Sequence, residues 1–215
     1  IGVGNVGSKV AEIASILGLK VLLNDPPRAR KEGNDSFVSL DEIIEKSDII
    51  TCHVPLQLNG QDATFHLFDQ ERISQLKPHQ ILINTSRGEV VDNKSLKTAL
   101  QNKMIKAASL DVWENEPDID TELMELLFTA TPHIAGYSLD GKANGTWMSV
   151  QAIGRKFNLP CKDWKVTEVP NPAQPVEFCI DLNGKNIDQV LDEAILYTYD
   201  IFTDDKRFRE NPTEF

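Results

Sequence analysis

Three residues of different chemistry lie where predicted strands end, in the middle of the chain: Arg87, Glu116 and His133. A guanidinium can bind a carboxylate through two parallel hydrogen bonds. An imidazole exchanges a proton with an alcohol near neutral pH, and a carboxylate beside it would orient the ring and favour its protonated form. Taken alone, each has an ordinary interpretation as a surface arginine, a solvated glutamate or a capping histidine.

A second group of residues, at the start of the chain, is typical of dinucleotide binding. Gly2, Gly4 and Gly7 match the pattern G-x-G-x-x-G and lead into a helical pattern. That helix is expected to end at Gly18, and the next apolar run ends in Asp25. Glycines allow the tight turn and let the backbone reach a pyrophosphate at the helix N-terminus. Asp25 would accept hydrogen bonds from the ribose and repel a 2′-phosphate, which favours NAD over NADP.

Alternating helices and strands are predicted around these residues. Helices are expected over 8–17, 39–46, 69–76, 92–102 and 121–128, and strands over 19–25, 48–54, 80–85, 105–112 and 130–133. Ser39 and Glu42 predict a capping box on the second helix. The alternation implies an α/β fold with a doubly wound parallel (Rossmann) sheet, whose ligands bind at the carboxyl ends of the strands.

The predicted domains follow from this pattern and from a change in composition. We expect an NAD-binding Rossmann domain over 1–137, a helix over 138–160 that returns to a substrate domain, and a proline-rich linker over 161–175. Only Ile1 remains of the strand expected before the glycine-rich turn, so the first strand is expected to be mostly missing and the chain to be cut from a longer one.

Residues 176–215 form the last predicted domain. Residues 176–181 alternate like a half-buried strand, Asn183-Gly184 is typical of a turn, and residues 186–202 are amphipathic at helical spacing. A small α+β domain of this length, incomplete at its C-terminus, has a poor core on its own. An isologous dimer would complete that core, so we predict a dimerisation domain.

Composition and charge exclude several classes of protein. The 215 residues include 22 Lys and Arg against 33 Asp and Glu, which gives a formal net charge of −11. Such acidity argues against nucleic-acid binding. The sequence has no apolar run long enough to cross a bilayer, no visible secretory signal and no cluster with metal-ligand spacing. Its three cysteines fit neither a disulfide nor a zinc pattern, and cytoplasm is the expected compartment.

Taken in order, the motifs resemble those of the D-2-hydroxyacid dehydrogenase family. The resemblance covers residue 2 to about residue 157. It rests on GVGNVG at 2–7, the aspartate at 25, HVPL at 53–56, INTSRGEVVD at 83–92, LDVWENEP at 110–117 and PHIAGYS at 132–138. The family reversibly oxidises a 2-hydroxy acid to a 2-oxo acid with a nicotinamide cofactor, so the resemblance implies an NAD-dependent oxidoreductase.

The resemblance also implies roles for individual residues. Arg87 would bind the substrate carboxylate and carbonyl, His133 would exchange the proton of the 2-hydroxyl, and Glu116 would hydrogen-bond His133. Tyr137 would touch the substrate, and no metal is expected. The residues that would line the cofactor site are Gly2, Gly4, Asn5, Val6, Gly7, Asp25, Val54, Thr85, Ser86, Asp111 and Gly136. Val54 stands where relatives often have threonine, a loss of one possible hydrogen bond of about 1 kcal/mol.

Within the family, three features are most similar to a member that acts on a phosphorylated 2-hydroxy acid and has an added dimerisation domain. They are Asp25-Pro26-Pro27-Arg28, the run at 134–146 and the tail at 176–215. A homodimer through the tail is expected, and residues that bind the phosphate are expected outside this sequence. Alternatives are a sibling acting on 3-phosphoglycerate or glycerate, an NAD-sensing binding protein without catalysis, and a fragment that binds NAD and dimerises without turnover.

Overall fold

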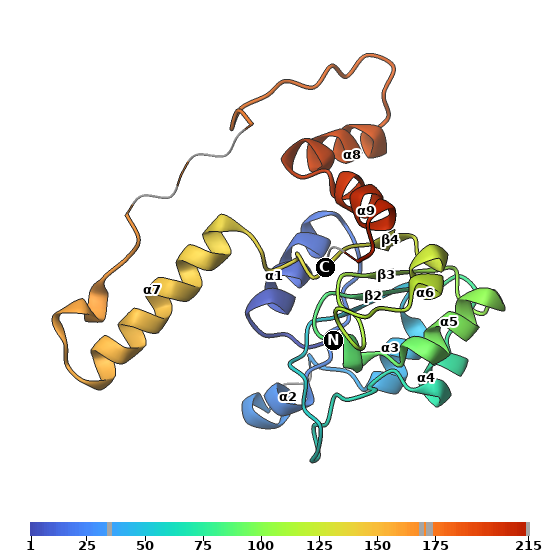
Figure 1. Ribbon diagram of the computed structural model, residues 1–215, viewed down its shortest axis with the longest axis horizontal. Coiled ribbons are helices and arrows are strands. Elements are labelled where there is room, and N and C mark those ends of the chain that lie inside the picture. Colours follow the sequence, from blue (N-terminus) through green and yellow to red (C-terminus); the bar gives the residue numbers. More distant parts are fainter. Residues whose placement is uncertain (34–35, 168–169, 171–173, 214–215) are drawn as a thin grey trace. The chain divides into compact units, whose positions relative to one another are not determined.

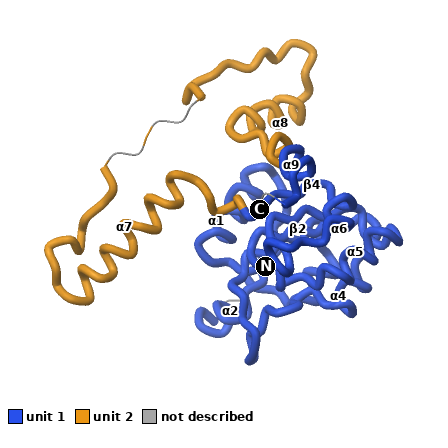
Figure 2. Tube along the Cα trace, in the orientation of Figure 1, with its two compact units in different colours: residues 1–133, 205–215 blue, residues 134–204 orange. Residues whose placement is uncertain are grey.

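The computed structural model describes residues 1–33, 36–167, 170 and 174–213. The chain forms two compact units: unit 1 comprises residues 1–133 and 205–215, and unit 2 comprises residues 134–204 (Figure 2). The boundary therefore follows His133, a little before the predicted end of the Rossmann domain at residue 137. Residues 168–169 and 171–173 of the predicted linker lie outside the described residues.

A parallel sheet lies at the centre of unit 1 (Figure 1). Its strands are β1 (Ile49–Cys52), β2 (Ile81–Asn84), β3 (Ala107–Leu110) and β4 (Thr129–Ala130), in the spatial order β1-β2-β3-β4. Each strand is parallel to the next one. The predicted α/β fold with a parallel, Rossmann-like sheet is thus confirmed, and the carboxyl ends of the four strands meet at one edge.

Backbone hydrogen bonds extend this sheet beyond β1 into the N-terminal segment. The paired residues are Ile1 with Thr51 and His53, Gly2 with Asn24, and Leu23 with Phe37. The segments around Leu23 and Phe37 therefore lie on one side of Ile1, and β1 to β4 follow one another on its other side. The order of the strands reverses between Ile1 and β1, and ligands of such sheets bind at this point of reversal. The prediction of a full strand over 19–25 is wrong. In the described part of the chain, the segments on its two sides form too few backbone hydrogen bonds with it, and Leu23 alone forms a β-bridge, with Phe37.

The helices of unit 1 precede, connect and follow these strands along the chain. They are α1 (Asn5–Ile16), α2 (Pro26–Glu32), α3 (Leu40–Lys46), α4 (Gln70–Ser74), α5 (Asn93–Gln101) and α6 (Thr121–Leu126), with the 3-10 turn η1 (Gly88–Val90). Helix α2 was not predicted. Asp25 caps it, and two prolines, which suit a first helical turn, begin it.

The caps of the other helices agree with their sequences. Side chains of Ser39, Asp69, Asp92 and Asp120 accept hydrogen bonds from the first turns of α3, α4, α5 and α6. Only one half of the predicted capping box on α3 appears among the described hydrogen bonds. Ser39 accepts from the Glu42 N–H, and the Glu42 carboxylate pairs with Lys46 at 2.9 Å.

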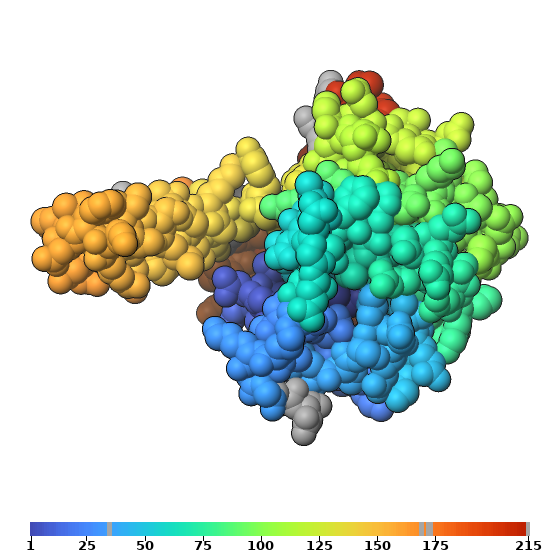
Figure 3. Space-filling view, turned by 90° about the horizontal axis from the view of Figure 1, so that it is seen from below, coloured from blue at the N-terminus to red at the C-terminus, as the bar shows by residue number. Residues whose placement is uncertain are grey.

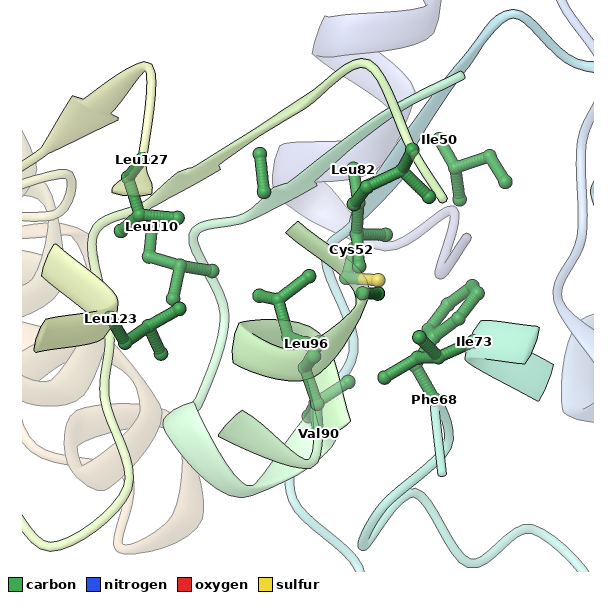
Figure 4. Close-up of a cluster of buried hydrophobic side chains, with 14 of the residues drawn as sticks. Ile50, Cys52, Phe68, Ile73, Leu82, Val90, Leu96, Leu110, Leu123 and Leu127 are labelled. Atoms are coloured by element: carbon green, nitrogen blue, oxygen red, sulfur yellow. The ribbon is translucent and has the colours of Figure 1, made fainter. Parts of the chain in front are cut away.

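Apolar side chains from the strands and from the segments between them fill the core of unit 1 (Figure 4). Ile50, Cys52 and Leu82 come from β1 and β2, and Phe68 and Leu96 come from the segments that cover them. Phe68 and Leu96 have no exposed surface. Most of the predicted strands and helices of unit 1 thus bury apolar residues on which their prediction was based. Helix α1 is the exception, because Ile13 and Ile16 are 55% and 72% exposed.

Cys52 is expected to resist alkylation in the folded protein. Burial on β1 raises the pKa of its thiol to about 11. The thiolate is the reactive form, so iodoacetamide at pH 8 should modify the exposed Cys179 well before the buried Cys52. Peptide mass spectrometry would measure both rates, with a urea-unfolded sample as the control. Equal rates in the folded protein would contradict the burial of Cys52.

Unit 2 is helical in its described residues. Helix α7 (Leu139–Lys156) is followed by the 3-10 turn η2 (Pro160–Asp163), which lies directly against it. Gly154 makes this contact possible, because a Cβ there would lie 2.6 Å from the Lys162 Cα. The beginning of the predicted linker over 161–175 is therefore folded onto α7.

The end of the chain differs from its prediction in two places. No strand forms over 176–181, where the described residues provide no partner strand. The predicted helix over 186–202 is interrupted between α8 (Ile187–Thr198) and α9 (Ile201–Glu210). Asp200 explains the interruption: its carboxylate accepts hydrogen bonds from Phe202 and Thr203 and so starts a new helix.

The second half of α9 packs on unit 1. Asp205 accepts a hydrogen bond from the Ala130 N–H at 2.6 Å, and Arg209 donates to the carbonyl of Met124 at 2.7 Å. Phe208 is buried, with its ring 5.8 Å from that of Trp113. This part of the predicted domain over 176–215 therefore belongs to the same compact unit as the sheet. Among the described residues no helix is long and apolar enough to span a membrane.

Candidate active site

The glycine-rich turn brings the start of α1 close to the first residues of the chain. Gly2 has a φ of +79°, which favours glycine, and a Cβ on Gly7 would lie 1.8 Å from the Gly2 carbonyl oxygen. A Cβ on Gly4, the N-cap of α1, would instead meet no protein atom within 4 Å. Asn5 and Val6 are exposed in the first turn. Open space before an exposed helix N-terminus fits a pyrophosphate.

Asp25 lies directly beside this turn. Its Oδ2 accepts a hydrogen bond from the Val3 N–H at 2.8 Å, and its Oδ1 accepts one from the Arg28 N–H at 3.0 Å. These two bonds fix the carboxylate between the glycine-rich turn and α2. A carboxylate oxygen can accept more than one hydrogen bond, so the half-buried Asp25 can also receive a ribose hydroxyl.

The loop after β2 presents Arg87. Asn84 is fully buried, and its Oδ1 accepts hydrogen bonds from the Ser86 N–H at 3.1 Å and the Ser86 hydroxyl at 2.7 Å. Its Nδ2 donates to the Arg87 carbonyl at 2.8 Å. Asn84 therefore shapes the loop, and the Arg87 side chain is exposed. The sequence interpretation missed this role, although a buried asparagine at the end of an apolar strand could have indicated it.

Glu116 and His133 are brought together by the loops after β3 and β4. Glu116 Oε2 lies 2.8 Å from His133 Nδ1, and Glu116 Oε1 accepts the Trp113 N–H at 2.8 Å. The carboxylate thus holds one ring nitrogen and leaves Nε2 to other partners. The His133 side chain is 39% exposed, so a small molecule can reach it.

Asp111, at the end of β3, connects the same two loops. Its buried carboxylate accepts a hydrogen bond from the Thr131 hydroxyl at 2.6 Å, and its carbonyl accepts the His133 N–H at 2.7 Å. The buried Trp113 donates its indole N–H to the Thr131 carbonyl at 3.0 Å. These bonds fix the backbone on both sides of the Glu116–His133 pair.

A second histidine–carboxylate pair anchors the loop that carries Glu116. His66 Nε2 lies 2.6 Å from Glu114 Oε1, and Glu114 Oε2 accepts the Asn93 N–H at 2.8 Å. The Asn93 side chain accepts the Glu114 N–H in return. None of these three residues was singled out from the sequence, because their contacts join segments that are far apart along the chain.

His53 connects β1 with the loop after β2. Its ring nitrogens lie 2.9 Å from the Thr51 hydroxyl and 3.5 Å from the Thr85 hydroxyl. Burial lowers the pKa of His53. The ring thus lies between Thr51 of β1 and Thr85 of the loop after β2. Val54, the next residue, lies against the glycine-rich turn, where a Cβ on Gly2 would come within 2.7 Å of it.

The remaining two predicted site residues, Gly136 and Tyr137, belong to unit 2. Within that unit the Tyr137 ring is 71% exposed and lies 3.3 Å from the Lys142 Nζ. No cluster of three or more possible metal ligands occurs in the part of the chain that the structure describes.

Gly88→Ala is expected to destabilise unit 1 by about 2–4 kcal/mol. The added Cβ would lie 1.9 Å from the Trp113 carbonyl oxygen, a backbone atom that cannot rotate away. Urea unfolding would measure the loss. Gly145→Ala is the matched control, since a Cβ there meets no atom within 4 Å and alanine favours the interior of α7. Equal stability of both variants would contradict the close approach of the two loops.

Comparison with known proteins gives consistent similarities. Residues 1–135 match the family description "D-isomer specific 2-hydroxyacid dehydrogenase, NAD binding domain". Erythronate-4-phosphate dehydrogenase of Bacteroides thetaiotaomicron is 46% identical over 215 residues, which are 100% of this chain and 59% of that protein. The enzyme of the same name from Porphyromonas gingivalis is 40% identical over 100% of this chain and 58% of its own length. The chain thus spans less than two thirds of these relatives.

Solved structures show the same fold with either dinucleotide. D-lactate dehydrogenase from Aquifex aeolicus, complexed with NAD and lactic acid, has a TM-score of 0.59 and 34% identity over 72% of this chain and 52% of its own. The NADPH-dependent glyoxylate/hydroxypyruvate reductase from Sinorhizobium meliloti, in complex with NADP and malonate, has a TM-score of 0.55 and 30% identity over 70% of this chain and 49% of its own.

Proposed function

Because the chain belongs to the D-isomer-specific 2-hydroxyacid dehydrogenase family, we propose that it is the NAD-binding part of an erythronate-4-phosphate dehydrogenase. The enzyme would oxidise 4-phospho-D-erythronate to 2-oxo-3-hydroxy-4-phosphobutanoate, in the synthesis of pyridoxal phosphate. The observation that carries the chemistry is the Glu116–His133 pair at 2.8 Å, at the strand edge that also presents Arg87. The substrate is proposed from the relatives that align with the whole chain.

The cofactor NAD, when bound, supplies the acceptor for the hydride that leaves C2 of the substrate. The open turn at Gly4 and the N-terminus of α1 would hold its pyrophosphate, since anions are favoured there. Asp25 would accept hydrogen bonds from the ribose. The other residues proposed to line the site are Gly2, Asn5, Val6, Gly7, Val54, Thr85, Ser86, Asp111 and Gly136.

The protein's own side chains would bind the substrate and accept its hydroxyl proton. Arg87 would bind the substrate carboxylate with two hydrogen bonds and so place C2 and its hydroxyl near His133. As the C2–H bond breaks, the hydroxyl proton would pass to His133 Nε2 and the remaining O–C2 bond would become a carbonyl. Glu116 would stabilise the resulting imidazolium through Nδ1, and Tyr137 would contact the substrate.

NADH formation tests this proposal. The protein in its full natural length should reduce NAD with 4-phospho-D-erythronate in clear preference to 3-phosphoglycerate and D-glycerate. Preference for another acid would keep the proposed roles of Arg87, Glu116 and His133 but overturn the substrate. Tight NAD binding without turnover of any acid would instead favour an NAD-sensing protein.

Gly4→Ala should weaken NAD binding by about tenfold or more while leaving the fold intact. The new methyl group would meet no protein atom, so it would occupy the space proposed for the pyrophosphate. Calorimetric titration with NAD would measure the affinity, and urea unfolding would measure the stability. Gly7→Ala is the comparison variant, because its Cβ would clash with the Gly2 backbone and lower stability itself. Unchanged NAD affinity in Gly4→Ala would count against a pyrophosphate at this turn.

The protein is further proposed to act as a homodimer in the cytoplasm. Ile187 and Ile195 on α8 are 68% and 52% exposed, and such an apolar face is suited to a second copy of the chain. Light scattering of the protein in its full natural length would test this. An Ile187→Asp/Ile195→Asp variant should become monomeric, and a wild-type monomer would overturn the proposal.

A further inference from the structure

An arginine beside the proposed ribose site is held by a glutamate of its own helix. Arg28 Nε and Nη2 donate to the two carboxylate oxygens of Glu32 at 2.7 Å and 3.0 Å, one turn further along α2. Its Nη1 donates to the Val3 carbonyl in the glycine-rich turn. The Arg28 side chain therefore points back toward that turn, and Glu32 occupies the side of the guanidinium best suited to bind an oxyanion.

Arg28 and Asp25 share the same neighbour. The Val3 N–H donates to Asp25, and the Val3 carbonyl accepts from Arg28. The guanidinium thus lies next to the carboxylate proposed to bind the ribose. Hydrogen bonding to Glu32 raises the pKa of Arg28, and the Asp25 charge acts in the same direction.

This position matters for the choice between NAD and NADP. In dinucleotide-binding folds an aspartate binds the ribose 2′-hydroxyl, whereas a nearby arginine accommodates the 2′-phosphate of NADP. Both cofactors occur in the structures that resemble this chain, one complexed with NAD and one with NADP. Arg28 alone would favour the phosphate, but it is already bound by Glu32, and the Phe37 ring lies 5.4 Å from its Cζ.

We propose that Glu32, by holding Arg28, is a second determinant of selectivity for NAD over NADP, beside Asp25. The proposal rests on the dinucleotide site of the proposed function. The charges of Asp25, Arg28 and Glu32 sum to −1, and loss of Glu32 would bring this sum to zero and release two N–H donors. The other nearby cations are Arg30, which pairs with Asp62, and Lys31, which acts on Glu32.

Calorimetric titration with NAD and with NADP tests this without any need for turnover. The proteins would be the wild type, Glu32→Ala and Glu32→Gln, each in its full natural length. We expect Glu32→Ala to bind NADP about tenfold more tightly, the scale of one charge-assisted hydrogen bond, with NAD affinity nearly unchanged. The gain should shrink at high salt. Helix α2 has no buried residue and lies on the surface (Figure 3), so the substitution leaves the core intact.

Two control variants test whether the effect on NADP binding comes from Glu32 acting through Arg28. Glu42→Gln breaks the equivalent pair with Lys46 on α3 and should leave both affinities unchanged. Arg28→Met added to Glu32→Ala should remove the gain for NADP. A selectivity ratio within twofold of wild type in both Glu32 variants, or a gain that survives without Arg28, would overturn the proposal.

The outcome is separable from that of the proposed function. A shift in selectivity without turnover of 4-phospho-D-erythronate would support the role of Glu32 and refute the enzyme assignment. Turnover of that acid with an unchanged ratio would do the reverse. A wild-type protein that binds neither dinucleotide would overturn both.

Discussion

His133→Ala is expected to lower kcat by about 10² to 10⁴-fold, the usual contribution of a positioned general base. The variant loses the nitrogen proposed to take the hydroxyl proton, whereas Arg87 and the glycine-rich turn remain. KM and NAD affinity should therefore change little. Initial rates of NADH formation and a calorimetric titration with NAD would measure these quantities on the protein in its full natural length. Near wild-type turnover would exclude His133 as the base.

Glu116→Gln should lower kcat less than His133→Ala does. The amide can still accept the Trp113 N–H, so the loop should keep its shape, but the negative charge next to His133 Nδ1 is lost. We expect kcat to fall by about ten- to a hundredfold, the range of one hydrogen bond to a charged group. A loss as large as that of His133→Ala would indicate that Glu116 has a role beyond orienting and stabilising the imidazolium.

The positions of the proposed catalytic residues could be predicted because a parallel sheet orders its loops. Arg87, Glu116 and His133 follow β2, β3 and β4, and the ends of successive parallel strands lie at one edge. Alternating apolar runs with clear caps identify such strands and helices in one sequence. That reasoning brings the right loops to the same edge without any knowledge of individual contacts.

The contacts that fix those loops could not be predicted in the same way. Asn84 shapes the Arg87 loop through side-chain bonds, and His66 meets Glu114 across a long stretch of chain. Both depend on which loops touch, and local sequence contains no such information. The apolar periodicity also predicted one helix over 186–202, which is wrong. The amphipathic pattern continues past Asp200, but the carboxylate of that residue starts a new helix.

Arg87→Ala is expected to reduce kcat/KM by about 10² to 10⁴-fold. The guanidinium is proposed to form two hydrogen bonds to the substrate carboxylate, each worth about 1.5–3 kcal/mol when charged. The substitution removes both, and the substrate is then neither bound nor placed against His133. Stability should fall by no more than about 1 kcal/mol, the scale of the one hydrogen bond that the Arg87 side chain donates to the Ser86 carbonyl, since the side chain is otherwise exposed and Asn84 holds the Arg87 carbonyl. Initial rates and urea unfolding would measure both expectations.

Arg87→Lys separates charge from geometry. Lysine keeps the positive charge but cannot form the planar pair of parallel hydrogen bonds, so its kcat/KM should lie between those of the wild type and Arg87→Ala. Added guanidinium ion at low concentration should restore part of the activity of Arg87→Ala and none of that of His133→Ala. Such rescue requires an empty place for a guanidinium beside the substrate. If Arg87→Ala loses activity and is not rescued, and Arg87→Lys is as impaired, the residue supports the loop rather than binding the acid.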